Sequence, residues 1–202
     1  MTVRHIVLDI GRVLLKWDPE LPYRRLIPDP ERRRWFLSEV CTPAWNHAQD
    51  GGRSWAEGEA ELIARFPAEA DLIRAYRATW CEMVPEPLAE TPQIMADLVA
   101  AGHDVTLLTN FHPETFAIAL QRFPFLQAAR GRTVSGEVGI TKPDPAIYAL
   151  HARRFGLEPA ATLFFDDSAA NVAAAEAAGW TGRLFTDAAR MRADLAATGV
   201  AY

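Results

Sequence analysis

The stretch RHIVLDIG at residues 4–11 is a short apolar run that ends in an acid and a glycine. Such a run is typical of a buried strand. The same pattern returns as DVTLLTN at 104–110 and as ATLFFDD at 161–167, and more weakly as TGRLF at 181–185. Apolar runs of this kind predict strands that are covered on both faces, as in a parallel sheet.

Helical patterns lie between or after these predicted strands. Pro143–Phe155 has proline near its start and Gly156 just past its end, which is the usual asymmetry of a helix. Further helices are predicted at 90–101, 113–123, 169–178 and 187–197. Strands that alternate with helices predict an α/β fold with a doubly wound, Rossmann-like parallel sheet.

Residues 17–88 interrupt this alternation, because they contain helical patterns and no convincing strand. Helices are predicted there at 30–40, 54–66 and 67–83. Five of the six tryptophans fall in this stretch, as expected of a small helical domain that needs large side chains to build a core. We therefore expect an all-α domain, inserted after the first strand.

The expected division is a core domain of residues 1–16 and 89–202 and an inserted helical domain of residues 17–88. The chain of 202 residues is half hydrophobic, which suits one or two globular domains and excludes disorder. Its net charge of −5 gives no basic field for nucleic acid, and no apolar run approaches the ~20 residues of a membrane span.

The N-terminal apolar run is too short for a secretory signal and is broken by Asp9. Cys41 and Cys81 cannot form a disulfide framework, and they lack the spacing of metal ligands. We therefore expect a cytoplasmic protein without a membrane or nucleic-acid partner. The sequence does not specify an oligomeric state.

Polar residues gather at the carboxyl ends of the predicted strands, where open parallel sheets bind their ligands. They are Asp9, Gly11, Thr109, Asn110, Asp166 and Asp167, and Lys142 opens a helix in GITKPDP. Taken singly, each is more typical of a turn or a helix cap. Together, a nucleophilic carboxylate, a hydroxyl, an amide, an ammonium and a second carboxylate pair indicate phosphoryl transfer.

Lys142 stands out by composition as well. The chain has 19 arginines and only two lysines, Lys16 and Lys142. A compact ammonium binds where a planar guanidinium does not fit, so a lysine in such a chain is worth inspecting. Its position in this motif supports a role for its charge.

The sequence resembles the haloacid-dehalogenase-like hydrolase superfamily. The resemblance is carried by HIVLDIGRVL at 5–14, LLTN at 107–110, GITKPDPAIY at 139–148 and LFFDDSAANVAAAEAAG at 163–179. It implies a doubly wound sheet with a lid domain over the site. An all-α lid inserted after the first strand resembles the subfamily of small phosphatases and 2-haloacid dehalogenases.

The resemblance implies that Asp9 is a nucleophile that forms an aspartyl-phosphate. It also implies that Mg²⁺ is held by the Asp9 carboxylate, the Gly11 carbonyl and the Asp167 carboxylate, with Asp166 behind them or reaching the metal through water. These are hard oxygen ligands, which Mg²⁺ prefers.

By the same resemblance, Thr109 and the main-chain amide of Asn110 bind the phosphoryl oxygens. Lys142 neutralises charge between the nucleophile and the phosphoryl group, as a preorganised cationic clamp should. The expected partner is a phosphorylated small molecule.

Position 11 departs from the pattern, because most phosphatases that the chain resembles carry an aspartate there as general acid and base. A subgroup resembling sugar-phosphate phosphatases also has Asp-x-Gly, usually followed by Asn, whereas this chain has Arg12. The Gly11 carbonyl can still bind the metal, but glycine has no side chain that could donate a proton. Arg12 cannot donate a proton, because guanidinium stays protonated. It could bind the substrate's phosphate or a remote anionic group, or form a surface ion pair.

We therefore expect a Mg²⁺-dependent phosphatase of small-metabolite phosphomonoesters, with a sugar phosphate as one candidate substrate. A 2-haloacid dehalogenase would use Asp9 without metal and would not need the Asp166–Asp167 pair. A non-catalytic phosphate-binding module is a third reading, motivated by Gly11. A receiver domain would carry its acidic pair after the first strand, and a dinucleotide enzyme would need a glycine-rich loop there.

The segment WNHAQDGGR at 45–53 is polar and contains glycine, which favours a loop between helices that could select the substrate. The candidate selector side chains are His47, Gln49, Asp50 and Arg53.

Overall fold

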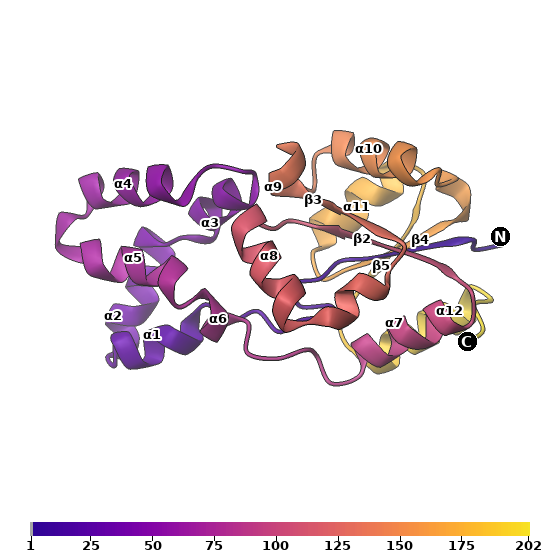
Figure 1. The fold of residues 1–202 in the computed structure, drawn as a ribbon, viewed down its shortest axis with the longest axis horizontal. Coiled ribbons are helices and arrows are strands. Elements are labelled where there is room, and N and C mark those ends of the chain that lie inside the picture. The colour runs from indigo at the N-terminus through magenta and orange to yellow at the C-terminus, as the bar shows by residue number, and fades with distance from the viewer. Residues whose placement is uncertain (1) are drawn as a thin grey trace.

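The computed structural model describes residues 2–202 and has a single five-stranded sheet at the centre of its α/β part (Figure 1). All strand pairs are parallel, in the order β3-β2-β1-β4-β5. The strands are β1 (His5–Leu8), β2 (Asp104–Thr109), β3 (Gly131–Val134), β4 (Thr162–Asp166) and β5 (Thr181–Leu184). This arrangement confirms the predicted doubly wound parallel sheet.

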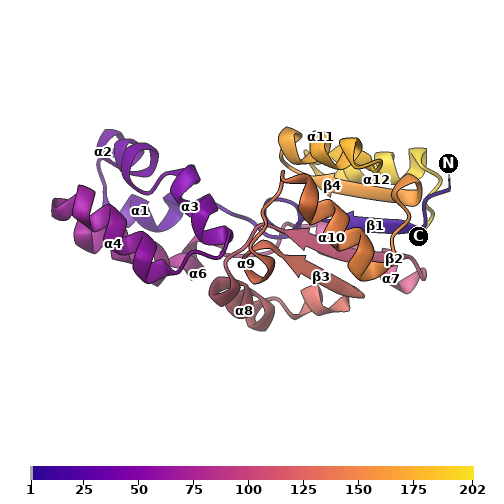
Figure 2. The same ribbon diagram turned by 90° about the horizontal axis from the view of Figure 1, so that it is seen from above.

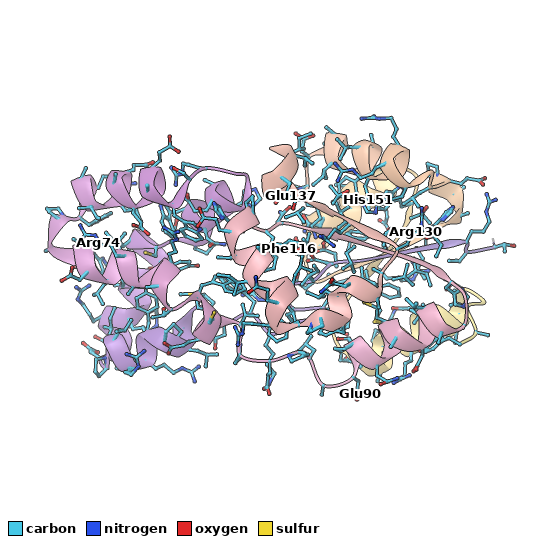
Figure 3. The ribbon with its side chains drawn as sticks, viewed as in Figure 1. Arg74, Glu90, Phe116, Arg130, Glu137 and His151 are labelled. Atoms are coloured by element: carbon cyan, nitrogen blue, oxygen red, sulfur yellow. The ribbon has the colours of Figure 1, made fainter. Side chains whose placement is uncertain are left out.

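Helices cover both faces of the sheet because neighbouring strand residues point to opposite sides. Ile6 and Leu8 join one apolar cluster with side chains of α7, α8 and α12, while Val7 joins another with α10 and α11. Phe116 of α8 and His151 of α10 mark these two sides (Figure 3). The helices of this part are α7 (Thr91–Ala100), α8 (Pro113–Arg122), α9 (Ser135–Val138), α10 (Pro145–Phe155), α11 (Ala169–Ala177) and α12 (Ala188–Ala197).

The strand register brings three strand ends level with one another. Leu8 pairs with Leu107 on one side and with Phe165 on the other. The residues that follow these positions therefore emerge at one edge of the sheet, and the Asp9 amide donates to the Phe165 carbonyl at 3.0 Å. This edge faces the helical part of the chain (Figure 2).

The chain between β1 and α7 is helical. Its helices are α1 (Glu20–Leu26), α2 (Pro30–Trp35), α3 (Pro43–Asp50), α4 (Trp55–Arg65), α5 (Ala70–Ala78) and α6 (Trp80–Met83), with a π-helical turn at Phe36–Val40. A separate apolar core fills this bundle, in which Trp45 packs edge-on against Trp55 and Tyr76. Of the five tryptophans predicted to build a helical core, Trp45 and Trp55 do so, whereas Trp80 joins the core of the α/β part and Trp35 is exposed.

The structure differs from the sequence prediction at the edge strand and within the helical part, among other places. The edge strand β3, Gly131–Val134, was not predicted, because only Thr133 and Val134 of its four residues are buried. The segment predicted as one helix at 67–83 is a 3₁₀ turn at Pro67–Glu69 followed by α5 and α6. Within residues 2–202, no helix combines the length and the apolar character needed to cross a membrane.

Candidate active site

Three side chains from different elements meet at the carboxyl edge of the sheet. Asp9 follows β1, Asp166 ends β4, and Lys142 lies in the loop before α10. The Lys142 Nζ atom lies 2.8 Å from Asp9 Oδ1 and 2.6 Å from Asp166 Oδ2. Since all three residues are buried, the ammonium is held between two carboxylates with little access to water.

Hydrogen bonds hold both the main chain and the ammonium group of Lys142. Its main-chain amide donates to Asn110 Oδ1, and Asn110 Nδ2 donates back to the Lys142 carbonyl, each at 2.8 Å. Its ammonium also donates to the Leu108 carbonyl at 2.9 Å. These bonds join the loop before α10 to the end of β2, so Asn110 positions Lys142 through its side chain.

The charges of this cluster do not cancel. Burial, with a smaller contribution from the charge of Asp166, raises the pKa of Asp9 to about 7 against the opposing charge of Lys142. Burial alone would lower the pKa of Lys142, but Asp9 and Asp166 together raise it, so the lysine stays charged. When both carboxylates are ionised, they carry one more charge than the single ammonium neutralises.

A third carboxylate, Asp167, completes the acidic group. Oxygens of Asp9, Asp166 and Asp167 all lie within 4.8 Å of one another. Asp166 is wholly buried and accepts hydrogen bonds from the Ser168 amide and the Asn171 side chain, whereas Asp167 is part-exposed. Burial and Asp166 raise the pKa of Asp167 against the opposing charges of Arg12 and Lys142. Oxygen donors so closely spaced suit a hard divalent cation.

Gly11 and Arg12 form a tight turn after Asp9. Arg12 has φ 57, and its amide donates to the Leu15 carbonyl at 2.7 Å. This left-handed backbone is unusual for a residue other than glycine, asparagine or aspartate. The Arg12 guanidinium lies 3.7 Å from Asp167 Oδ2 and is largely exposed. A side-chain Cβ built on Gly11 would meet no atom within 4 Å, so position 11 has room for a larger residue.

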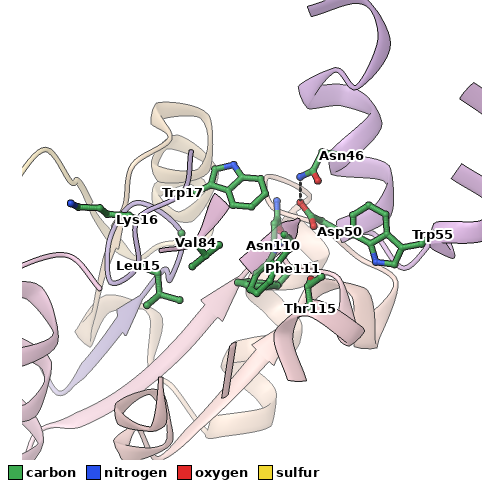
Figure 4. A pocket seen from close by; sticks show the side chains of 12 residues that line it. Leu15, Lys16, Trp17, Asn46, Asp50, Trp55, Val84, Asn110, Phe111 and Thr115 are labelled. Carbon is green, nitrogen blue, oxygen red and sulfur yellow. Dashed lines mark hydrogen bonds between the residues drawn. The ribbon is translucent and has the colours of Figure 1, made fainter. Parts of the chain in front are cut away.

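A cavity of about 100 Å³ lies next to these residues, between the sheet edge and the helical segment (Figure 4). Its apolar walls are Leu15, Trp17, Trp55, Trp80, Val84 and Phe111. Gly11 and Asn110 also line it, and Thr109, which is buried at the end of β2, precedes Asn110. The cavity therefore joins the residues after β1 and β2 to an aromatic surface of the helical segment.

The segment 45–53 is not the expected loop. Residues Pro43–Asp50 form helix α3, which begins where Thr42 Oγ1 accepts from the Trp45 amide at 3.0 Å. Asn46 and Asp50, one turn apart, line the cavity, and Asn46 Nδ2 donates to Asp50 Oδ2 at 2.9 Å (Figure 4). The threonine–proline pair before α3 is a helix-start signal that predicts this helix.

The other candidate selectors face elsewhere. The wholly buried Gln49 donates to the Trp45 carbonyl, His47 contacts Thr141 at 3.0 Å, and Arg53 pairs with Glu61. Of the four, Asp50 is the one that lines the cavity. Asn46 was not among the candidates, and the tryptophans that line the cavity were predicted as core residues and not as residues of the site.

A family model matches most of the chain. Residues 4–179 match the family described as haloacid dehalogenase-like hydrolase. A curated relative, the sesquiterpene phosphatase astK of Aspergillus oryzae, is 24% identical over 187 residues, which cover 92% of this chain and 91% of the relative.

Two solved structures share the fold over nearly the whole chain. A HAD family enzyme from Bacteroides thetaiotaomicron, in complex with magnesium and inorganic phosphate, has a TM-score of 0.68 and 20% identity, covering 94% of this chain and 98% of its own. The L-2-haloacid dehalogenase from Xanthobacter autotrophicus, with chloropropionic acid covalently bound, has a TM-score of 0.67 and 16% identity, covering 100% and 85%.

Proposed function

The chain belongs to the haloacid dehalogenase-like hydrolases, and from this membership we propose that it is a Mg²⁺-dependent phosphatase that hydrolyses small phosphomonoesters. The observation that carries the proposal is the buried contact of Asp9 and Asp166 with Lys142, beside a third carboxylate. The relatives support it, since one is a sesquiterpene phosphatase and another binds magnesium and phosphate.

The acidic group fits a magnesium ion. Three closely spaced carboxylates stand against one buried ammonium, and burial with the charge of Asp166 raises the pKa of Asp9 to about 7. We propose that Asp9, Asp167 and the Gly11 carbonyl would hold the ion, with Asp166 behind them. When bound, Mg²⁺ would offset the negative charge of the phosphoryl oxygens and of Asp9.

The protein's own groups perform the remaining work of the proposed mechanism. Asp9 attacks phosphorus, the bond from phosphorus to the alcohol oxygen breaks, and water later cleaves the aspartyl-phosphate to release phosphate. Thr109 and the main-chain amide of Asn110 hold the phosphoryl oxygens, while Lys142 orients Asp9 and favours its ionised form. Charge stabilisation by such fixed groups is commonly the largest contribution to a rate. We assign Arg12, beside Asp167, to binding the substrate's phosphate.

We further propose that residues 17–88 act as a cap over a core of residues 1–16 and 89–202. The cap would hold the alcohol part of the substrate against Trp17, Trp55 and the other apolar walls of the cavity. This surface favours an alcohol with an apolar face, as the sesquiterpene phosphatase relative also suggests, over a sugar. A cavity of about 100 Å³ holds only a small ester, so a larger one needs the cap to open.

The competing assignment is a 2-haloacid dehalogenase, in which Asp9 attacks carbon and no metal takes part. The apolar walls of the cavity favour it. The acidic cluster argues against it, because a metal-free site has no use for three carboxylates whose oxygens lie within 4.8 Å.

A substrate screen separates these activities. We expect phosphate release from prenyl, aryl or alkyl phosphates that requires Mg²⁺ and stops in chelator, and no halide release from 2-chloropropionate. Asp9→Asn should abolish turnover and leave the fold intact, because an amide is a poor nucleophile of nearly equal shape. Halide release without metal would establish the dehalogenase instead. Magnesium and phosphate binding without turnover would indicate a non-catalytic module.

A further inference from the structure

A phosphatase with glycine at position 11 needs another proton donor for its departing alcohol. Of the residues that line the cavity, Lys16 and Asp50 carry titratable side chains. Lys16 is half-exposed and bonded to Glu86 at 2.5 Å, so its ammonium is already engaged outside the cavity. Asp50 is the remaining candidate.

The fold fixes the end of helix α3, and with it Asp50, against the sheet edge. The Ser135 hydroxyl donates to the main-chain carbonyl of Asp50 at 2.5 Å, and His47, one turn earlier, contacts Thr141 at 3.0 Å. On the other side, Gln49 packs within the helical bundle beside Gly58 of α4. Asp50 therefore comes from the helical segment, yet it is anchored to the part that carries Asp9.

The surroundings of the carboxyl group suit a proton donor. Asn46 Nδ2 donates to Asp50 Oδ2 at 2.9 Å, which orients the group. Burial raises the pKa of Asp50 to about 8, with a further contribution from the charge of Asp9, although a hydrogen bond from the His112 main chain opposes it. A pKa in this range favours the protonated carboxyl group near neutral pH, and the side chain lines the cavity that Gly11 also lines.

The direction in which the alcohol departs gives a second argument. In an in-line displacement the departing oxygen lies on the far side of phosphorus from the attacking oxygen. Asp9 attacks from the end of β1, so the departing oxygen points away from the sheet and toward the helical segment, from which Asp50 reaches the cavity (Figure 4).

We propose that Asp50 is the general acid of this enzyme and supplies the proton that Gly11 cannot supply; the inference rests on the proposed phosphatase function. As the Asp9 oxygen bonds to phosphorus, the bond to the alcohol oxygen breaks, and that oxygen takes its electron pair together with the Asp50 proton. The Asp50 carboxylate then accepts a proton from the water that attacks the aspartyl-phosphate. Phosphate leaves, and both aspartates return to their starting states.

The test is a series of Mg²⁺-dependent kcat/KM measurements on phosphate esters whose leaving groups range from 2,4-dinitrophenol to simple alkyl alcohols. General acid catalysis is worth about 10²–10⁴-fold where the leaving group is poor. Asp50→Asn should therefore lower kcat/KM by this much on alkyl phosphates and far less on the dinitrophenyl ester. The dependence on leaving-group pKa becomes steeper than in the wild type.

The free space at Gly11 offers a rescue that a structural role of Asp50 would not allow. Gly11→Asp in the Asp50→Asn background should restore activity on alkyl phosphates by at least tenfold and flatten the dependence again. Asp71→Asn, which changes a fully exposed acid of α5, is the matched control and should leave the series unchanged.

Each other outcome counts against the assignment. A loss at Asp50→Asn that is equal for all esters would make Asp50 a binding or structural residue, and no loss on alkyl phosphates would make it a bystander. If the wild type itself releases no phosphate from any ester while Asp9→Asn behaves identically, the phosphatase function fails and the role of Asp50 fails with it.

Discussion

The ammonium nitrogen of Lys142 lies 2.8 Å from Asp9 Oδ1 at a point where the two side chains are only 1% and 10% exposed. A buried ion pair adds little net stability, but removing one partner leaves an unpaired buried charge, which costs about 3–5 kcal/mol. This asymmetry makes the lysine the most sensitive position of the site.

We therefore expect Lys142→Met to lower the free energy of unfolding of the metal-free protein by about 3–5 kcal/mol, measured in urea without Mg²⁺. The other lysine, Lys16, supplies the control. Because its pair with Glu86 is half-exposed, Lys16→Met should change that free energy by less than about 0.5 kcal/mol. Equal effects of the two substitutions would show that Lys142 is not buried between carboxylates.

Asn110 should act through Lys142. Asn110→Ala keeps the main-chain amide assigned to the phosphoryl oxygens but removes both hydrogen bonds to the Lys142 main chain. A misplacement of a reacting group by about 1 Å can cost on the order of 10²-fold in rate, so kcat should fall by about 10- to 100-fold with a smaller change in KM. Gln93→Ala, which removes an exposed amide bonded to Asp97, should leave both constants unchanged. A rise in KM alone would assign Asn110 to substrate binding.

The strands that carry the site were predictable because their signal is local. In β1, β2 and β4 a buried apolar run ends in a polar residue, and a reader of the sequence sees both features within a few positions. The edge strand β3 gives no such signal, because GRTV begins with a glycine and an arginine that are only half-buried. Its pairing with β2 depends on tertiary contacts.

The residues missed in the site are those whose role depends on distant partners. The Asn110 side chain bonds to a loop 32 positions away. The sequence therefore indicated a role for the Asn110 main-chain amide, but not the side-chain hydrogen bonds to Lys142. Asp50 was one of several polar candidates in a segment that resembles a loop because of Gly51 and Gly52. The helix that places Asp50 at the cavity begins at its N-cap residue, Thr42. The sequence prediction gave more weight to the polar residues of the segment than to this N-cap signal.

Asp166 and Asp167 should separate metal binding from stability. Asp166 is wholly buried and bonded to Lys142, Ser168 and Asn171, whereas Asp167 is part-exposed and near Arg12. We expect Asp167→Asn to weaken Mg²⁺ binding in calorimetry more strongly than Asp166→Asn does. Asp166→Asn should instead cause the larger loss of stability in metal-free protein. If Asp166→Asn abolished Mg²⁺ binding and Asp167→Asn did not, their proposed roles would be exchanged.

The last prediction concerns His151, which lies between α10 and the sheet and away from the site (Figure 3). Its ring nitrogens contact the hydroxyls of Thr106 and Thr133 at 2.9 Å each, and the residue is wholly buried. Burial, together with the charges of Arg154 and Arg130, lowers the pKa of His151 to about 3. In the unfolded chain a histidine has a pKa of about 6.5.

The sign of the pH dependence follows from these two pKa values. Above pH 6.5 the ring is neutral in both states, and its contribution to stability is fully present. As the pH falls from about 6.5 toward 3, the unfolded chain binds a proton that the folded protein excludes, so stability falls by up to about 1.4 kcal/mol per pH unit.

His151→Gln removes this titration. On acidification, the unfolding free energy of the wild type should therefore fall relative to that of the variant by up to about 1.4 kcal/mol per pH unit. Thr106→Val removes one hydrogen bond but keeps the ring, so it should lower stability at every pH and preserve the slope. A constant difference between wild type and His151→Gln from pH 7 to pH 4 would mean that the buried ring is protonated in the folded protein as readily as in the unfolded chain.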